Sequence, residues 1–578
     1  MLVERFDSLR RDYPHSSLVL LSPLAEGADR LAARVALRSG LRLIVPLPMP
    51  RAIYDADFET PEAKREFEEL LTQAEAWFEL PLLPGSSVES VSRPGADRDH
   101  EYAKVGAYIA TYTHVFIALW DGTPASHGTL IGGTAASVQF RLKGAPDQYF
   151  RRGRHLISSG GGIVEHLVTP RESGDPPSDA LTFKVLVPED RTKESLERLL
   201  RRMDLFNRDA SVGGVALRAS AEQSVAQLLH TDGSSVETMK ATLPRSSLPV
   251  LEQYAVADAL SIAFGRRELT TTKRVFLGVF VAAILLNMHA FFYHSFFGHH
   301  ETSSVPGRLV AMPWFLLCFL ALSAYTALRL HRRAEIGEYQ QKHLDYRALA
   351  EALRVQFFWS VWGVHEAVAH RYLQRHRSDL EWIRSALLGS AVLMSAQESG
   401  TPSRLPWPER VAFLMRHWVG DQRAYYSSKA RRERHTFHRE QELSERLVKA
   451  GVMLISLLAA GMTIPLIFPT ASLEHIRHVL LLPALGPGIE FVAVILAVGA
   501  GLLIGFGNQM GRAEHVREFT RMGELFSACE QEIDSHVQRR EWERCTPVVM
   551  EVGEQALDEN GDWLILHRER PLEVPHAG

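Results

Sequence analysis

The sequence predicts an α/β domain with a doubly wound parallel sheet at the N-terminus, followed by an α-helical integral membrane domain with four spans and long cytoplasmic helices. Short apolar runs alternate with helical patterns over residues 1–205, which is typical of a parallel sheet. Four later windows contain no Asp, Glu, Lys or Arg, and long stretches rich in helix-forming residues adjoin them. This segregation of charge excludes a purely soluble protein.

The overall composition narrows the class of protein and of partner. The 578 residues are 46% hydrophobic and 23% charged, which excludes a disordered or fibrous chain. A net charge of -4 gives no general attraction to polyanions, so we expect no nucleic-acid partner. The three cysteines are too few and too scattered for a disulfide framework or a zinc site. The N-terminus has no apolar segment, so we expect no cleavable secretory signal.

The four charge-free windows predict membrane-spanning helices. They are Val275–Phe297, Leu309–Leu328, Ala450–Phe468 and Phe491–Gly507. A hydrocarbon core about 30 Å thick needs around 20 apolar helical residues. The first three windows are long enough, whereas the fourth is marginal and leaves a buried soluble helix as its alternative.

Basic residues beside these windows predict their orientation. Those next to the first and second spans are Arg266, Arg267, Lys273, Arg274, Arg329, Arg332 and Arg333. By contrast, the two connections within the hairpins contribute only Arg308 and Arg477. Because cytoplasmic flanks carry the excess of Lys and Arg, we expect both chain ends and the long middle segment in the cytoplasm.

Small and polar residues within the spans predict how the helices pack. Ala497, Gly501 and Gly505 recur every four residues and would permit close approach to another span, in the same subunit or in another copy of a homo-oligomer. Three polar side chains, those of Asn287, His289 and His294, lie in the first span. Such groups predict a bundle interior or a water-filled path, and ordinary hydrogen bonding between helices is the alternative.

Strand and helix patterns alternate through the N-terminal domain. The predicted strands are SSLVLLS, LRLIVPLP, THVFIALW, GGIVEHLVTP and LTFKVLVP. The predicted helices between them are ADRLAARVALRSG, ETPEAKREFEELLTQAEAWF, EYAKVGAYIATY and GGTAASVQFRLKG. This order predicts a parallel sheet that is covered on both faces.

Two strand-to-helix turns have the character of ligand-binding loops. Parallel sheets bind ligands at the carboxyl ends of their strands, where helix N-termini offer N–H groups to anions. The first turn, SPLAEGADRL, offers Ser22, Glu26, Gly27, Asp29 and Arg30. The second, LWDGTPASHGTLIGGTA, offers Asp121, Gly132, Gly133 and Thr134. We expect a phosphate-bearing ligand with no metal or cofactor, and plain tight turns with helix caps are the alternative.

The run LLSPLAEGADRLAARVAL, followed by LIVPLP, VFIALWDG and GGTA, resembles the SLOG superfamily over roughly residues 1–190. These are Rossmann-like domains that sense nucleotide-derived signals or, in some branches, cleave nucleotides. The resemblance implies that the nine residues of the two turns line a ligand pocket. The chain starts inside what would be the family's first helix. Its IGGTAASVQ also lacks the glutamate of the nucleotide-cleaving motif PGGxGTxxE, which favours binding over hydrolysis.

Helical patterns dominate the remainder of the chain. Ser-, Thr- and Gly-rich residues 206–246 predict a linker with one short helix. The helix pattern that follows the second span has its weak points at Gly337 and Gly363, where we expect a bend. The chain is thus divided into a sensing domain (1–205), a linker (206–246), a first transmembrane hairpin (247–330), a helical stalk (331–446), a second hairpin (447–510) and a C-terminal helical segment (511–578).

The stalk contains a motif that resembles a catalytic signature only in part. HEAVAH, from His365 to His370, has one residue too many for the zinc-protease spacing, so a solvated helix surface is predicted. The basic run from Lys429 to Arg439 predicts a hydrated face, and contact with anionic lipid head groups is the alternative. We expect Trp359, Trp362, Trp382, Trp407 and Trp418 to pack the stalk.

The segments YAVADALSIAF, HLDYRALAEALRVQFFW and EQALDENGDWLILHRERPL resemble the SLATT family of membrane modules. That family typically has two spans, so duplication or elaboration is implied here. The resemblance implies a membrane-perforating effector in a bacterial inner membrane, gated by a nucleotide-derived signal, in antiviral or inter-bacterial conflict. A membrane-tethered enzyme that cleaves NAD or a nucleotide is the alternative, and a scaffold without gating is a third interpretation.

Overall fold

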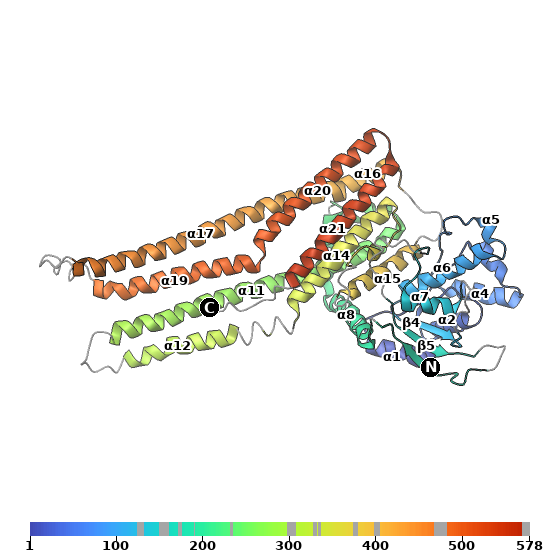
Figure 1. The fold of residues 1–578 in the computed structure, drawn as a ribbon, viewed down its shortest axis with the longest axis horizontal. Helices are drawn as coiled ribbons and strands as arrows, with labels where there is room; N and C mark the ends of the chain where they lie inside the picture. Colours follow the sequence, from blue (N-terminus) through green and yellow to red (C-terminus); the bar gives the residue numbers. More distant parts are fainter. Residues whose placement is uncertain are drawn as a thin grey trace. The chain divides into compact units, whose positions relative to one another are not determined.

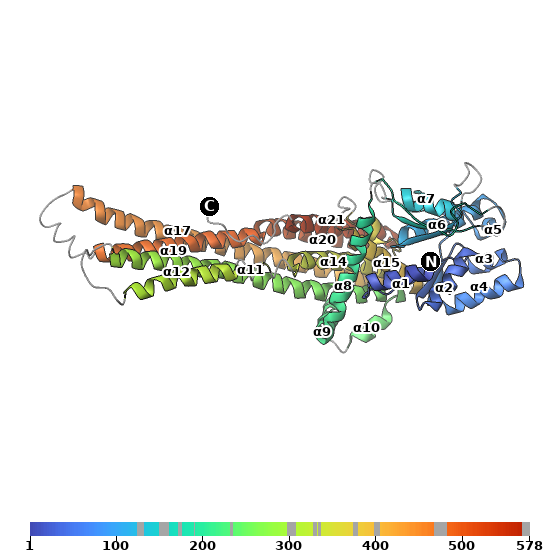
Figure 2. The same cartoon turned by 90° about the horizontal axis from the view of Figure 1, so that it is seen from below.

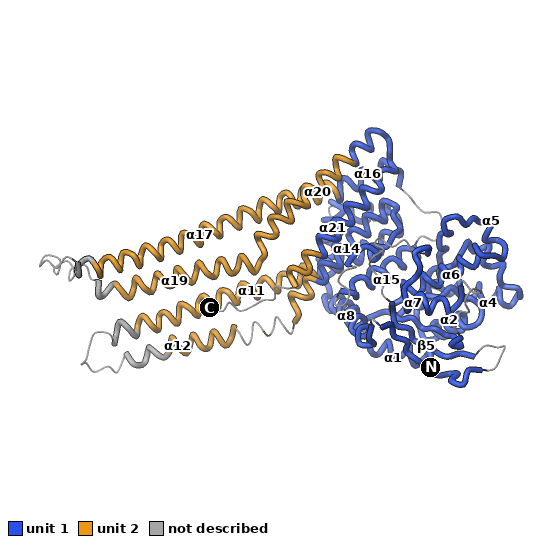
Figure 3. Tube along the Cα trace, viewed as in Figure 1, with its two compact units in different colours: residues 1–260, 345–418, 533–561 blue, residues 261–344, 419–532, 562–578 orange. Residues whose placement is uncertain are grey.

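The computed structural model describes residues 1–123, 132–149, 161–170, 176–189, 191–231, 235–297, 308–326, 332, 337–373, 380–397, 405–467 and 482–568. The chain is mostly helical in these residues and divides into two compact units (Figure 3). Unit 1 comprises residues 1–260, 345–418 and 533–561. Unit 2 comprises residues 261–344, 419–532 and 562–578.

Unit 1 begins with a small, wholly parallel sheet (Figure 1). Helix α1 (Leu2–Asp12) is followed by β1 (Val19–Leu21), α2 (Ala28–Arg38), β2 (Arg42–Leu47), α3 (Arg51–Tyr54), α4 (Pro61–Gln73) and β3 (Ala76–Glu79). The strand order is β1-β2-β3, and both pairs are parallel. Alternate residues of β2 are buried on opposite faces, Leu43 against α2 and α4, and Ile44 against side chains of α6 (Ala96–Tyr112) and α15 (Glu381–Gln397). Both faces of this sheet are therefore covered, as predicted.

A second small sheet follows. It comprises β4 (Phe116–Trp120), β5 (Val164–Val168) and β6 (Phe183–Leu186), with α7 (Thr134–Lys143) between the first two strands. Strands β4 and β5 are parallel, whereas β5 and β6 are antiparallel. Residues 176–182 before β6 form turns rather than a crossover helix, so the chain returns in the opposite direction. The single doubly wound parallel sheet is not confirmed, because the described strands form two sheets and one pair is antiparallel.

Strand β3 corrects a prediction. One helix was predicted over residues 59–78, but α4 ends at Gln73. Ala74 leaves the helical conformation with ψ 142°, and the N–H of Glu75 donates to Leu43 O at 2.9 Å. Pairing with β2 buries Phe78 in the core beneath α15, and this tertiary contact outweighs the local helix preference.

Residues 206–246 are another correction, because they are largely helical rather than a linker. Helix α8 (Lys193–Val212) runs through the expected boundary and is followed by α9 (Gly214–Leu228) and α10 (Val236–Thr242). Phe206 packs edge-on against Tyr346, with ring centroids 5.2 Å apart. The hydroxyl of Tyr346 donates to Asp209 at 2.8 Å. These long-range contacts fix α8 against the helical part of unit 1.

Helix α14 (Tyr339–Trp362) lies between the two glycines predicted as weak points. A turn at Gly337 and Glu338 precedes it, and Gly363, with φ +96°, follows it. Trp359, Trp362 and Trp418 are among the largest fully buried side chains. The Trp362 indole N–H donates to the Thr546 hydroxyl at 3.0 Å, in α21 (Cys545–Arg568). A bend was expected near one of these glycines, and the helix is in fact interrupted at both; these three tryptophans pack the helices as expected.

The predicted spans lie in α11 (Leu248–Phe297), α12 (Arg308–Ala324), α17 (Gly420–Ile467) and α19 (Leu482–Gln509). Among the described residues, three helices are long and apolar enough to cross a membrane, and they include the first and fourth windows and the third up to Ile467, since Phe468 lies outside the described residues. The second window coincides with a shorter apolar helix, Trp314–Ala324, and Leu328 lies outside the described residues.

Within unit 2, α17 and α19 run side by side (Figures 1 and 2). The Ser444 hydroxyl of α17 donates to Ala500 O of α19 at 3.3 Å. Gly505 faces α11, where an added Cβ would lie 3.6 Å from the Phe276 ring. An added Cβ on Gly501 would meet no atom within 4 Å, so the two glycines predicted to share one packing face have different surroundings.

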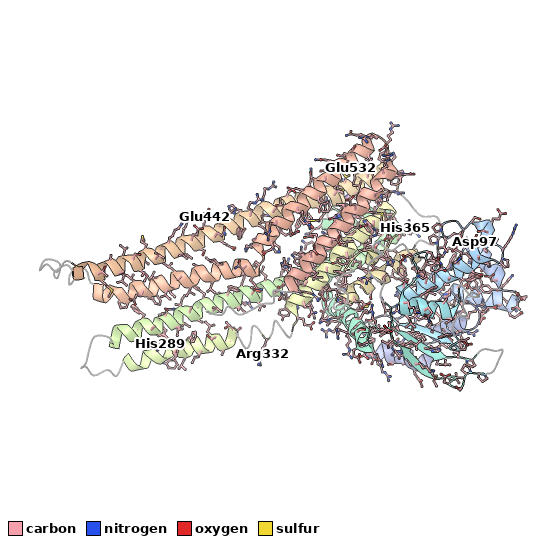
Figure 4. The ribbon with its side chains drawn as sticks, in the orientation of Figure 1. Asp97, His289, Arg332, His365, Glu442 and Glu532 are labelled. Carbon is pink, nitrogen blue, oxygen red and sulfur yellow. The ribbon has the colours of Figure 1, made fainter. Side chains whose placement is uncertain are left out.

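The three polar side chains of the first span differ in their surroundings. The Asn287 side chain donates to Ala283 O of its own helix at 2.8 Å. His289 is half-buried on α11 (Figure 4), and the side chain of His294 lies outside the described residues. This hydrogen bond of Asn287 therefore requires no neighbouring helix.

Candidate functional site

The first predicted turn joins the carboxyl end of β1 to α2. Gly27 has φ +87° and immediately precedes α2. A Cβ added to Gly27 would meet no atom within 4 Å, and Glu26 beside it is exposed. The backbone at Gly27, directly before α2, therefore borders open space, and the free N–H groups of such a helix start can bind anions or hydroxyl groups.

Two of the predicted ligand residues in this turn instead hold it together. Arg30 is only 1% exposed, and its guanidinium donates to Leu24 O at 3.1 Å and to Ala63 O at 2.8 Å. It also pairs with Glu66 at 3.1 Å. The Ser22 hydroxyl, also buried, accepts the Leu24 N–H at 3.3 Å. These contacts fix the turn to α4 and direct both polar groups inward.

Asp29 is the titratable group of the first turn. It is half-buried in the first turn of α2, and burial raises its pKa to about 6, against the effect of a hydrogen bond with the Ala25 backbone. Tyr54 lies nearby and donates its hydroxyl to Pro23 O at 3.1 Å. A carboxyl group that titrates near neutral pH can accept a hydrogen bond from a ligand or exchange a proton with it.

The second predicted turn leads into α7. Gly133 has φ +97°, and a Cβ added to it would meet no atom within 4 Å. Thr134 is exposed, and the first turn of α7 carries no acidic residue. Gly132 has a different role, since its added Cβ would lie 3.3 Å from both the Ala103 nitrogen and the Tyr102 Cβ on α6. Gly132 thus permits close packing, and Gly133 leaves the helix start open.

Asp121 directly follows strand β4, and its side chain bonds to the loop that begins there. Its carboxylate accepts the Thr123 N–H at 3.0 Å. Residues 124–131, which complete the predicted loop, lie outside the described residues. The structure therefore places Asp121 at the carboxyl end of β4, as predicted, without relating it to Gly133.

An aromatic pair lies between the two turns. The rings of Tyr54 and Tyr102 have centroids 6.1 Å apart. Tyr54 is bonded to the first turn, and Gly132 of the second turn packs against Tyr102. The first turn offers the carboxylates of Glu26 and Asp29, whereas the second offers backbone N–H groups and a hydroxyl. The first turn thus offers acceptors for hydroxyl groups, and the second offers donors for an anion.

Helix α6 also borders a cavity of about 1350 Å³, which was not predicted from the sequence. Its lining comes mainly from α6, the segment after β3, residues 365–370 and α15. We call it the mixed cavity because apolar side chains lie beside acidic and basic ones, among them those of Asp97, His100, Lys104, His365 and His370; Figure 4 labels Asp97 and His365. The spacing of Asp97, His100, Lys104 and Tyr108 on one helix face was the available signal.

The HEAVAH segment at this cavity is not a solvated helix surface, which corrects a prediction. Gly363 ends α14, and Val368–His370 forms a short 3-10 helix whose Val368 and Ala369 are fully buried. His370 is half-buried, with its Nε2 3.0 Å from the Tyr112 hydroxyl. The chemistry of His370 is therefore determined by the surrounding protein rather than by solvent.

The charged pair at the mixed cavity has a structural task. Lys104 is buried and pairs with Glu101, and its ammonium donates to Pro81 O at 2.6 Å. Glu101 also accepts the Leu83 N–H at 2.9 Å. Burial lowers the pKa of Lys104, against the effect of Glu101. Together the two side chains hold the segment after β3 on α6.

No protein-family model, curated protein or solved structure matches the chain. Within the described part of the chain, no three His, Cys, Asp or Glu side chains gather in a way that could hold a metal ion. The chemistry of the site therefore depends on the open helix starts at Gly27 and Gly133. It also depends on the carboxyl groups of Glu26 and Asp29 beside Gly27.

Proposed function

We propose that the chain is a membrane effector gated by a nucleotide-derived signal, as its resemblance to the SLOG and SLATT families implies. The observation that carries this proposal is the pair of open glycine turns. Gly27 and Gly133 both adopt positive φ at a helix start, and no side chain obstructs either. A phosphate group would accept N–H groups at the start of α7, while ribose hydroxyls would donate to Asp29 and Glu26.

Binding opens a membrane path only if the ligand favours one state of the protein over another. Four helices, α11, α14, α20 (Arg512–Gln538) and α21, have residues in both units. The start of α11 is buried in unit 1 at Val250, Leu251 and Tyr254, and the same helix continues into the first predicted span. This continuity of the chain supports a mechanical route from ligand to membrane.

The proposed setting is a bacterial inner membrane, with four spans and both termini in the cytoplasm. The second span of this scheme is α12, whose apolar sequence is similar to that of the longer helices. The exposed position of Gly501 on α19 supports contact with a second copy in a homo-oligomer. A role in antiviral or inter-bacterial conflict follows from the family resemblance.

A dye-release assay tests the proposal. Full-length protein would be reconstituted in dye-loaded liposomes and exposed to a panel of nucleotides, including NAD, ADP-ribose and cyclic dinucleotides. We expect at least one compound to trigger release at micromolar concentration, and nucleoside analogues without phosphate to have no effect. Release that is independent of every nucleotide, or binding without any release, would contradict the gated effector.

A membrane-tethered enzyme that cleaves NAD or a nucleotide is the second candidate. The position of Asp29 favours it, because a carboxyl group with a pKa of about 6 beside an open helix start is suited to acid–base catalysis. Chromatography of the nucleotides after incubation separates the two functions. The Asp29→Asn variant should lose turnover if the chain is an enzyme, whereas a sensor forms no product with either protein.

A further inference from the structure

The two sheets of unit 1 end at β1 and β4, and these strands do not pair with each other. They are nevertheless neighbours, because Leu20 of β1 and Ile117 of β4 pack in one apolar cluster with Phe6 of α1. A cavity of about 460 Å³, the intersheet cavity, is lined by both strands and by residues of α1, α6, α8, α11, α14 and α15. Its size is within the range of small-molecule sites.

The lining of the intersheet cavity is mainly apolar. Leu20, Ile44, Phe116, Leu200, Leu353 and Trp382 are representative. Arg42, the lining residue with a permanent charge, is exposed and pairs with Glu75 at 3.3 Å. An ionised ligand would therefore lose its hydration without gaining a buried counter-charge, so the cavity selects against charge.

Most polar groups of the lining are already bonded within the protein. His114 Nε2 bonds to Ser385 O at 2.9 Å, and the Asn207 amide donates to the Ser16 hydroxyl at 3.1 Å. The Ser390 hydroxyl donates to Oε1 of Gln253. The amide nitrogen of Gln253 makes no hydrogen bond to any described residue, and Gln253 lines the cavity from α11. Together with the hydroxyls of Tyr13 and Ser17, which also make no hydrogen bond to a described residue, the Gln253 amide is thus a polar group available in a mainly apolar lining.

We propose that the intersheet cavity binds a neutral, largely apolar molecule whose single carbonyl or hydroxyl oxygen accepts a hydrogen bond from the Gln253 amide. Apolar cavities take up apolar molecules because their lining gains contacts that water does not provide. The ligand would touch β1, β4 and the start of α11 at once. This site is independent of the nucleotide site, since none of the nine residues of the two turns lines the cavity.

Benzophenone is a suitable probe, because it is neutral and apolar, has one carbonyl acceptor and attaches to nearby C–H bonds under light. Full-length protein in lipid nanodiscs would be irradiated with benzophenone, and the labelled residues would be mapped by mass spectrometry. We expect labels in residues 16–21, 113–117 and 382–393, in addition to labels in the lipid-facing helices. Labels confined to the lipid-facing helices would overturn the proposal.

Two variants make the test specific. Ala386→Phe fills the intersheet cavity, so its label there should fall at least fivefold and its melting temperature should rise. Ala391→Phe is the matched control on the same helix, because Ala391 lines the mixed cavity instead. Equal labelling of the cavity segments in wild type and Ala386→Phe would overturn the proposal, as would a lower melting temperature with unchanged labelling.

A second variant tests the hydrogen bond and does not depend on how well a larger side chain fits. Gln253→Leu keeps the volume and removes the donor, so half-maximal labelling should need about fivefold more benzophenone. Unchanged labelling would overturn the role of Gln253. Competition then identifies the source of the natural ligand. Displacement by a monoacylglycerol assigns it to the membrane, and displacement only by short soluble ketones assigns it to the cytosol; either result supports the site.

Discussion

The hydroxyl of Tyr112 lies 3.0 Å from Nε2 of His370, which joins the last turn of α6 to the segment that follows α14. The two residues are 258 positions apart in the chain. Burial is the largest influence on His370 and lowers its pKa to about 4, with nearby Arg384 acting in the same direction. The imidazole is thus neutral at physiological pH, and the hydrogen bond to Tyr112 connects the α/β part of unit 1 to its helical part.

We expect His370 to make unit 1 less stable in acid. Its folded pKa lies below the unfolded value of 6.5, so its stabilising effect is complete above pH 6.5 and is lost as the pH falls towards 4. The His370→Gln variant cannot titrate there. The stability difference between wild type and variant should shrink by about 2 kcal/mol between pH 7.5 and 4.5. Thermal unfolding followed by tryptophan fluorescence measures this difference, and a constant difference would contradict the assignment.

The sequence predicted correctly those strands and helices in which the residues themselves form a clear apolar pattern. Strands β1, β2, β4, β5 and β6 occur where short apolar runs predicted them. Strand β3 was missed because Trp77 and Phe78 continue a helical pattern, and only pairing with β2 distinguishes them. Residues 206–246 were misjudged because their Ser and Gly content outweighed contacts, such as Phe206 against Tyr346, that no local pattern contains.

The candidate site divides in the same way. Gly27 and Gly133 were predictable, because open helix starts after strands favour glycine at positive φ. The inward direction of Arg30 was not, because it depends on Glu66 and on carbonyl groups from other segments. The mixed cavity joins residues from five separate segments, so no single window of the sequence could indicate it.

The second glycine turn can be tested with a matched pair of variants. Gly133→Ala would place a methyl group where the proposed ligand's phosphate would approach, so we expect nucleotide affinity to fall at least tenfold. Gly85→Ala is the control, because Gly85 has the same φ of +97° and the same open surroundings. Both substitutions should cost about 1 kcal/mol of stability through backbone strain. Weaker binding in Gly85→Ala alone would instead place the ligand in the mixed cavity, which Gly85 lines.

Asp29 should destabilise the folded protein at neutral pH. Because burial raises its pKa from 3.8 to about 6, its favourable state is present below pH 3.8 and is lost as the pH rises through 6. At pH 7.5 the Asp29→Asn variant should be more stable than wild type by about 1–2 kcal/mol, and the gain should disappear near pH 4. Thermal unfolding across this range measures it.

Asp97→Asn is the control for this prediction. Asp97 occupies the second position of α6, as Asp29 does in α2, but it is exposed. Its substitution should lower the stability by a few tenths of a kcal/mol, since a carboxylate interacts favourably with a helix N-terminus. A similar loss in Asp29→Asn would contradict the burial of that carboxyl group.

The number of membrane crossings depends on α12. If α12 spans the bilayer, Ser303 lies outside the cell and Arg332 lies inside it. Variants Ser303→Cys and Arg332→Cys would be made in a Cys318→Ala background, in which Cys529 and Cys545 are buried. A membrane-impermeant maleimide should label only Ser303→Cys in spheroplasts, and both variants after permeabilisation. Equal labelling in intact spheroplasts would place both positions on one side and exclude the second span.

Arg512 joins the start of α20 to α17 in unit 2. Its guanidinium lies 3.0 Å from a Glu433 oxygen and 2.8 Å from a Glu440 oxygen. All three side chains are half-buried, so the pairs should be worth more than exposed ones and less than fully buried ones. We expect Arg512→Ala to lower the stability by about 2 kcal/mol, because two carboxylates then remain near each other without the shared cation.

A double substitution separates this repulsion from lost packing. Adding Glu440→Gln to Arg512→Ala removes one of the two carboxylates and should restore about half of the lost stability. Arg512→Lys should recover less, since one ammonium group on a flexible stem cannot hold both glutamates as the planar guanidinium does. Melting temperatures of these proteins and of the single variant Glu440→Gln, measured in nanodiscs, provide a double-mutant cycle. If Arg512→Ala costs less than about 0.5 kcal/mol, the contacts behave as ordinary surface ion pairs and do not fix α20 to α17.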